Sequence, residues 1–223
     1  MKINLSKADL IAVYTDDSNY LNSKGAKYYS EQDYERAVEY YRLASSMGNA
    51  QATCNLGYCY LYGRSIPVNV DLAIQYFKLA AKEDVIDAIY KLGDIFSRDK
   101  WVKPDKEIAA YYYLKGLEYF SKDSWSLFYN QEARRYPSLF FAVGRESMLN
   151  GILNTDLDFA YLCLKIAEDG YKKYIGDGDT MYQESYDNVL KLLEDESLKD
   201  AKERFDKKYK GNDDDDDDFD EED

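Results

Sequence analysis

The chain has 223 residues, of which 45% are hydrophobic, enough to bury a core in one ordinary domain. It holds no histidine and only three cysteines, so histidine-based catalytic triads, histidine metal sites and a disulfide framework are not expected. The formal net charge is −14, but ten of the 43 acidic residues stand between positions 213 and 223. The other 33 acids nearly balance 29 basic residues, so no direct nucleic-acid binding is expected.

No run of 18 apolar residues indicates a transmembrane helix, and residues 1–13 lack the basic start and apolar block of a secretory signal. Together with the sparse cysteines, this favours a cytoplasmic protein that does not bind membranes. Residues 6–14 predict a short helix, with Ser6 as N-cap and Asp9 in its first turn. We expect residues 1–18 to form a segment that caps one end of the fold.

Two sequence motifs, called phrases below, recur along the first half of the chain. The phrase A-V-E-Y-Y-R-L-A at residues 37–44 returns as A-I-Q-Y-F-K-L-A at 73–80 and as A-A-Y-Y-Y-L-K-G at 109–116. A second phrase, A-x-x-x-L-G-x-x-aromatic, stands at residues 52–60 and 88–96. Self-similarity at a period of about 20 to 50 residues is typical of stacked helical hairpins. Most repeated residues are therefore expected to form a core between helices.

The starts of the repeated helices also recur. Four residues before the first alanine of each helix stands Asp33, Asn69, Asp105 or Asp156, whose side chain can accept hydrogen bonds from free N–H groups of the first turn. The intervals are 36, 36 and 51 residues, so we expect an insertion of about 15 residues within 117–138.

Glycines mark the middle of the helices that carry the second phrase. Gly57 and Gly93 each cost about 1 kcal/mol relative to alanine, which predicts a close contact with a neighbouring helix. Gly144 precedes Ala160 by 16 residues, as Gly57 precedes Ala73, so residues 139–170 predict a looser repeat.

The C-terminal part departs from the repeat. Residues 170–178 predict a turn, and residues 179–194 and 197–210 predict two helices, so that 171–210 would cap the end of the array. The like charges of residues 211–223 predict a disordered tail.

On these phrases the chain resembles the tetratricopeptide superfamily, specifically its Sel-1-like repeat branch, over residues 19–116 and more loosely to 170. The first unit, with Gly25, Tyr28 and Tyr41, is similar to the tighter tetratricopeptide pattern. The resemblance implies an all-α fold, a right-handed superhelical solenoid of antiparallel helix pairs. It also implies a non-catalytic adaptor whose concave groove holds a peptide, a protein segment or another subunit, homo-oligomers included. The missing histidines and glycine motifs separately lead us to expect no cofactor and no metal.

The resemblance further implies that the helix with the L-G-x-x-aromatic phrase lines the groove. Positions six and three before its glycine, and one, four and five after it, then point away from the core. In the second unit these include Cys54 and Leu61. Tyrosines and amides at such positions can hold an extended chain by stacking and hydrogen bonding, although they could equally be ordinary solvated positions. Our candidates for partner binding are Asn22, Tyr29, Gln51, Tyr58, Tyr62, Asp87, Tyr90, Asp94 and Arg98.

The insertion combines aromatic residues with paired arginines, a composition enriched at interfaces. Its candidates for partner binding are Trp125, Tyr129, Arg134 and Arg135, and the alternative is that its aromatics extend the core. A rival function is an acidic inhibitor of a nucleic-acid enzyme, of the immunity or anti-defence type, acting through the acidic tail and surface. The sequence contains neither phosphate-binding glycine motif, and no catalytic residue is assigned.

Overall fold

The computed structural model describes residues 4–120, 123–149, 153 and 156–209, without the side chains of residues 124 and 125. Within this part of the chain it contains helices and no strand, which confirms the expected all-α fold. The chain divides into two compact units, residues 1–112 and 113–223, and the boundary falls inside a helix. Each unit is described below by itself.

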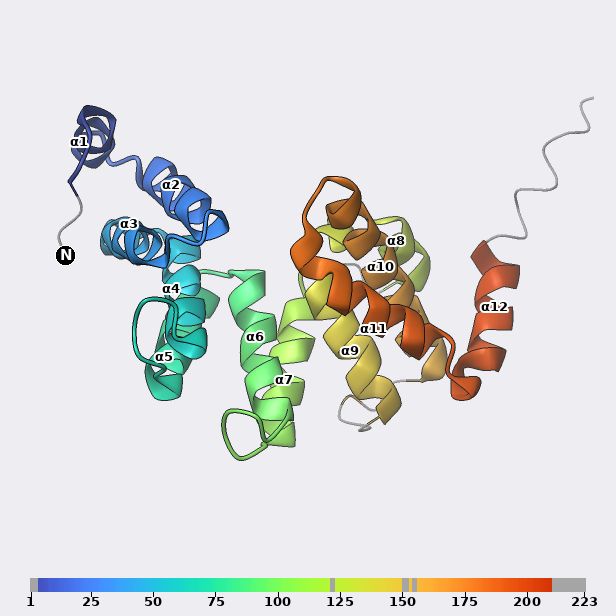
Figure 1. Cartoon of the computed structure of the whole chain (residues 1–223). Helices are drawn as coiled ribbons and strands as arrows, with labels where there is room; N and C mark the ends of the chain where they lie inside the picture. Colours follow the sequence, from blue (N-terminus) through green and yellow to red (C-terminus); the bar gives the residue numbers. More distant parts are fainter. Residues whose placement is uncertain (1–3, 121–122, 150–152, 154–155, 210–223) are drawn as a thin grey trace, which may run out of the picture. The chain divides into compact units, whose positions relative to one another are not determined.

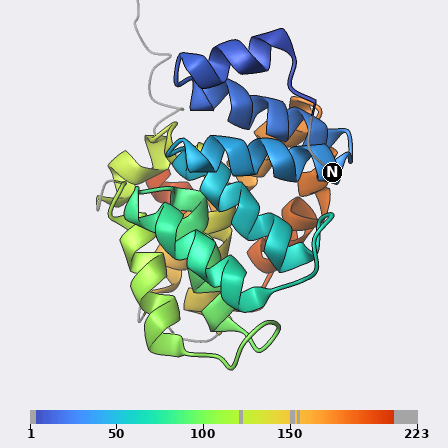
Figure 2. The ribbon, with the colours of Figure 1, turned by 90° about the vertical axis from the view of Figure 1, so that its left-hand side faces the viewer.

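Unit 1 is built from successive helices joined by short turns, and neighbours in the sequence pack against one another (Figure 1). Figure 2 shows the first three helices one above another at one end of this unit. The helices are α1 (Lys7–Tyr14), α2 (Ser18–Ser30), α3 (Tyr34–Ser46), α4 (Ala50–Tyr62), α5 (Val70–Lys82), α6 (Ile86–Ser97) and α7 (Lys106–Leu117), the last of which crosses into unit 2.

The predicted helix starts are confirmed. Asp33, Asn69, Asp105 and Asp156 each accept a hydrogen bond from the backbone N–H three residues later, at 3.1, 2.9, 2.9 and 2.8 Å. These bonds satisfy donors that the first turn of a helix cannot pair internally. The same turn chemistry therefore sets where each repeated helix begins.

The close helix contacts predicted at the glycines are present at Gly57, and also at Gly25 and Gly144. A Cβ atom on the glycine would lie under 3 Å from the side chain of the partner helix, closer than real Cβ atoms come. The absence of a side chain thus lets the two helices approach. The contacts join Gly25 to Tyr41, Gly57 to Phe77, and, in unit 2, Gly144 to Leu164.

The repeated alanines form the core, as expected. Ala37, Ala44, Ala73 and Ala80 are completely buried, where a methyl side chain allows helices to pack closely. The apolar side chain of Ile66, in the loop between α4 and α5, also packs against this core.

Unit 2 contains the insertion, a further helix pair and the C-terminal helices. Between α7 and α9, within the expected insertion at residues 117–138, the described residues include a short helix and a 3-10 turn. The elements are α8 (Ser124–Tyr129), η1 (Ala133–Arg135), α9 (Pro137–Leu149), α10 (Leu157–Gly176), η2 (Thr180–Tyr182), α11 (Gln183–Leu193), η3 (Glu196–Leu198) and α12 (Lys199–Tyr209).

The turn predicted at residues 170–178 is confined to residues 177–178, and the prediction is wrong for residues 170–176. Helix α10 continues to Gly176, and only Gly178, at a φ of 96°, has the left-handed conformation of a turn. Gly170 lies inside the helix because the backbone carbonyl of Arg134 and the ring of Pro137 pack against it. The glycine that suggested a break therefore serves a helix contact.

The C-terminal helices pack on unit 2 through aromatic residues. Phe205 and Tyr209 of α12 lie against Phe128 of α8, with ring centroids 5.0 and 4.8 Å apart. The tail predicted to be disordered, residues 211–223, lies outside the described residues.

Candidate functional site

Side chains of α2, α4 and α6 interact across the gaps between these helices on one side of unit 1. We call this set the α2–α4–α6 face. In α2 and α4 the glycine contacts the partner helix of the same pair, so residues on the opposite side of each helix turn outward. The face consists of Asn22, Gln51, Asn55, Tyr58, Tyr62, Asp87, Tyr90, Lys91, Asp94 and Arg98.

Amide side chains link α2 to α4. The Asn55 amide group donates to the Asn22 carbonyl oxygen at 3.0 Å, and the Gln51 amide group reaches the Asn55 oxygen at 3.5 Å. One turn earlier, Asn49 donates to Asn19 at 2.9 Å. Each amide carries both donors and an acceptor, so this half of the face can exchange hydrogen bonds with a peptide backbone.

Tyrosine side chains link α4 to α6. The Tyr58 hydroxyl donates to the Tyr90 hydroxyl at 3.3 Å. The Tyr58 ring stacks on Tyr62, with centroids 6.3 Å apart, and meets the Phe77 ring edge-on at 5.1 Å. Tyr62 in turn lies edge-on to Trp101 at 5.7 Å. Tyr58 and Tyr90 are thus held by the core, whereas Tyr62 is the exposed member.

Lys91 occupies the centre of the tyrosine half, and only 6% of its surface is exposed. Its ammonium group lies 4.9 Å above the Tyr90 ring centroid, 5.5 Å above that of Tyr58, and 3.4 Å from the Asp94 carboxylate. Burial by itself would lower the pKa of Lys91, but Tyr90, Asp94 and Tyr62 outweigh it and raise that pKa above its usual value. Lys91 therefore carries a buried positive charge.

The carboxylates of the face differ in their surroundings. Asp94 also accepts from the guanidinium of Arg98, the residue that follows α6, so one carboxylate pairs with two basic side chains. Burial raises the pKa of Asp87, and the positive charge of Lys91 offsets part of this rise. The charges of the face are therefore mixed, without a strongly acidic or basic centre.

The structure brings together most, but not all, of the predicted groove residues. Tyr29 stands apart from the face, edge-on to Tyr34 at 5.1 Å; burial raises its pKa, and nearby Arg64 opposes that rise. Cys54 and Leu61, which the same spacing assigned to the groove, are completely buried, and that expectation is wrong. Both belong to the core cluster that includes residues of α6, because neighbouring repeats cover these positions.

Sequence reasoning missed two members of the face, Asn55 and Lys91. Each stands two residues before its glycine, a position that the groove spacing left out. In both repeats this side chain meets a neighbour, Asn22 for Asn55 and the tyrosine pair for Lys91. A polar residue recurring at that position was the available indication.

The residues predicted in the insertion take different positions. Arg134 is mostly buried: it pairs with Asp169 of α10 at 3.0 Å and donates to the carbonyl oxygens of Phe128 and Asn130 at 2.5 and 3.2 Å. Arg135 is exposed and pairs with Glu132 at 3.1 Å.

The aromatic residues of the insertion are described only in part. Tyr129 is half exposed, with its ring 5.1 Å from that of Phe128. The side chain of Trp125 lies outside the described residues. The insertion thus holds Arg134 in a packing role and presents Tyr129 and Arg135 at the surface.

A cavity of about 350 Å³ lies between α10 and α12 in unit 2. Apolar side chains, among them Phe159, Leu162 and Phe205, form part of its lining. Arg204 pairs with Asp158 at its edge, at 2.7 Å. Among the described residues no group of three potential metal ligands comes together, and no helix there is long and apolar enough to cross a membrane.

Comparison with known proteins identifies the repeats. A model of the Sel1 repeat family matches residues 18–49, 50–85 and 86–118. Two Arabidopsis thaliana proteins described as ERAD-associated E3 ubiquitin-protein ligase components, HRD3B and HRD3A, are 42% and 40% identical over 55 residues. Those matches cover 25% of this chain and 9% and 8% of the relatives.

An F-box protein of the same plant is 36% identical over 69 residues, 31% of this chain and 19% of that protein. The chain therefore matches less than a fifth of the length of each of these relatives. A Sel1 repeat protein from Oxalobacter formigenes, solved by crystallography, has a TM-score of 0.45 at 20% identity, covering 80% of this chain and 88% of that chain.

Proposed function

We propose that this chain, which contains three Sel1 repeats in residues 18–118, is a non-catalytic scaffold that binds a peptide or protein segment of a partner on the α2–α4–α6 face. Proteins built from these repeats typically mediate protein–protein interactions and are typically not enzymes. The chain would thus work by holding a partner in place.

The observation that carries the proposal is the set of polar and aromatic side chains that link α2 to α4 and α4 to α6, from Asn22 on α2 to Arg98 just after α6. An extended peptide has unpaired backbone N–H and C=O groups, and a row of amides and hydroxyls can pair with them. Tyr62 and Arg98 are of the residue types that most often dominate binding energy at interfaces. Because the side chains of the face already hold one another, a ligand would meet a preorganised surface.

The test changes the exposed members of the face and leaves its buried members intact. Tyr62→Ala and Arg98→Ala, combined in the full chain, should weaken partner binding by at least about tenfold, since each removes an anchor worth more than about 1 kcal/mol. Partners are captured from a lysate of the source cells and quantified by mass spectrometry. The matched control, Leu79→Ala with Lys82→Ala, removes one apolar and one basic side chain from the exposed surface of α5 and should leave capture unchanged.

The same experiment separates the scaffold from the rival acidic inhibitor. A chain ending at Lys210 lacks the ten acids of the tail. If its partner binding is lost while the Tyr62 and Arg98 variant retains it, the tail is the binding element and the proposal fails. Binding by the tail should also weaken steeply between 0.05 and 0.5 M salt, on the order of ten- to a hundredfold, whereas binding by the face should change little.

A further inference from the structure

Helix α1 buries a charged residue and exposes its large apolar ones, the reverse of the usual pattern. Asp9 is completely buried, whereas Leu10, Ile11 and Tyr14 are 55%, 53% and 93% exposed. At about 100° per residue these three side chains fall on one side of the helix, opposite Asp9. An eight-residue helix thus presents a continuous apolar stripe to solvent.

The contacts of Asp9 fix which side of α1 faces outward. Its carboxylate accepts hydrogen bonds from the Lys24 ammonium at 2.6 and 2.8 Å, from the Tyr40 hydroxyl at 2.9 Å, and from the Ser6 N–H and hydroxyl at 2.7 Å. Rolling the helix to bury Leu10 and Ile11 would pull this carboxylate away from its partners. The stripe is therefore held in the solvent by the polar anchor beneath it.

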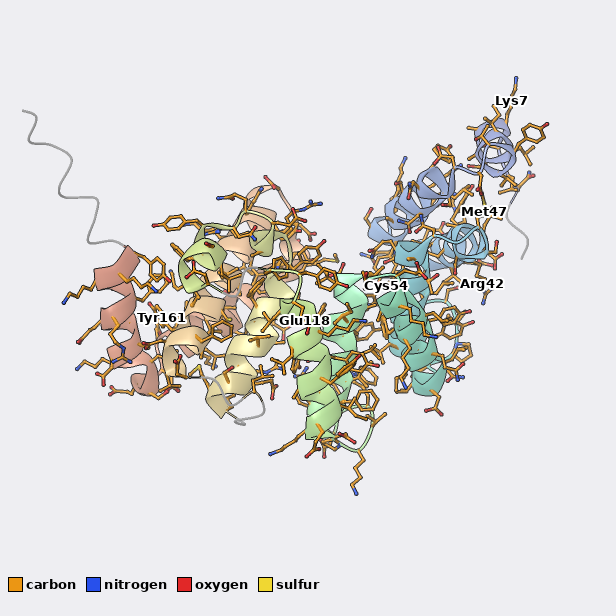
Figure 3. All side chains as sticks on the ribbon, turned by 180° about the vertical axis from the view of Figure 1, so that it is seen from behind. Lys7, Arg42, Met47, Cys54, Glu118 and Tyr161 are labelled. Atoms are coloured by element: carbon orange, nitrogen blue, oxygen red, sulfur yellow. The ribbon has the colours of Figure 1, made fainter. Side chains whose placement is uncertain are left out.

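The charges at the ends of α1 indicate what fits the stripe. Lys7 stands at its N-terminal end and points away from the rest of unit 1, as Figure 3 shows, and Asp16 follows its C-terminal end. If a second α1 lay antiparallel across the stripe, with a two-fold axis near Ile11, Lys7 of each copy would face Asp16 of the other. A two-fold pairing needs a patch that is complementary to itself, and this patch has an apolar centre with an exposed basic residue before it and an exposed acidic residue in the turn after it.

We propose that the stripe formed by Leu10, Ile11 and Tyr14 is a self-association surface, through which two copies of the chain pair with their α1 helices antiparallel. This surface is separate from the α2–α4–α6 face and leaves that face available. The apolar residues would supply the attraction, and the Lys7 and Asp16 pairs would set the antiparallel direction. So small an interface belongs to the weak class, for which we expect a dissociation constant on the order of 0.1 mM.

Sedimentation equilibrium of the full chain from about 1 μM to 1 mM tests the pairing. The average mass should rise from that of one chain toward that of two. Leu10→Lys with Ile11→Lys should raise the dissociation constant at least about tenfold, because it places charges in the centre of the contact. Leu79→Lys is the matched control: Leu79 is 53% exposed on α5, as Ile11 is on α1, and its substitution should leave the association unchanged.

A charge exchange tests the antiparallel direction. Lys7→Glu should weaken pairing about three- to tenfold, because it places two acidic side chains opposite each other at both ends of the contact. Adding Asp16→Lys to it should restore the association. Circular dichroism checks that these surface variants remain folded. A chain that stays monomeric to 1 mM, an association that survives the Leu10 and Ile11 changes, or a charge exchange that fails to restore pairing would each overturn the proposal.

Discussion

Replacing the buried carboxylate of α1 by an amide should destabilise unit 1 in a way that depends on pH. Burial alone would raise the pKa of Asp9, but its hydrogen bonds from Lys24, Ser6 and Tyr40 outweigh burial and lower that pKa from 3.8 to about 2. Because the pKa is lower in the folded state, the stabilisation is present above about pH 4 and is lost as the pH falls toward 2.

The magnitude follows from the size of the shift. A difference of almost two pKa units corresponds to about 2 kcal/mol, and because Lys24 lies near the surface we expect 1–2 kcal/mol from this linkage. Asp9→Asn also leaves the Lys24 ammonium without its counter-charge. At pH 7 the variant should therefore be about 2–3 kcal/mol less stable than the natural chain. Near pH 2 the two proteins should differ by less than about 1 kcal/mol.

Urea unfolding at several pH values measures this difference. The chain has two tryptophans, so Trp125→Phe in both proteins leaves Trp101 as a fluorescent reporter of unit 1. Asp71→Asn, which removes an exposed carboxylate from the first turn of α5, controls for charge. Equal stability of Asp9→Asn and the natural chain at pH 7, or a difference that stays constant down to pH 2, would refute the reasoning.

Two further pairs of substitutions probe the contacts of the helices. Gly57→Ala should lower the free energy of unfolding by about 1–2 kcal/mol, because the new methyl group would lie 2.8 Å from the Phe77 ring. Gly176→Ala, which has open space around it, should be neutral or stabilise by up to about 1 kcal/mol. Thermal melts measure both, and equal effects would contradict the packing argument. Asp94→Asn should cost about 3 kcal/mol because it leaves Lys91 charged and buried without its ion-pair partner. Lys91→Met should cost less because Asp94 keeps a second basic partner, Arg98. Urea unfolding measures both costs, and the reverse order would contradict this account of the pair.

The sequence predicted the helices and their starts well because both depend on local chemistry. An aspartate or asparagine at the right distance from the repeated alanine caps its helix whatever surrounds it, and all four predicted caps form. Gly170 was misread for the opposite reason. Its role depends on Arg134 and Pro137, which lie more than thirty positions earlier in the chain.

The candidate site was predicted less completely than the fold. Helical spacing indicates which side chains point away from the core of their own helix pair. It does not indicate which of these side chains are buried by the neighbouring repeat. Cys54 and Leu61 were therefore wrongly assigned to the groove, while Asn55 and Lys91 were missed. Burial of a lysine is not expected from its residue type; here two tyrosine rings and a carboxylate make it tolerable.

The glycine contacts have a consequence for how such an array can grow. Gly57 and Phe77 lie on the two helices of one pair, as do Gly25 and Tyr41, so each pair brings both sides of its closest contact with it. A duplicated or transplanted pair would keep that contact without any change elsewhere. Side chains such as Lys91 instead contact the neighbouring helix pair. A new neighbour would have to supply a complementary side chain for each such contact. Gene duplication could thus lengthen the core freely, while the surface across the junctions would diverge.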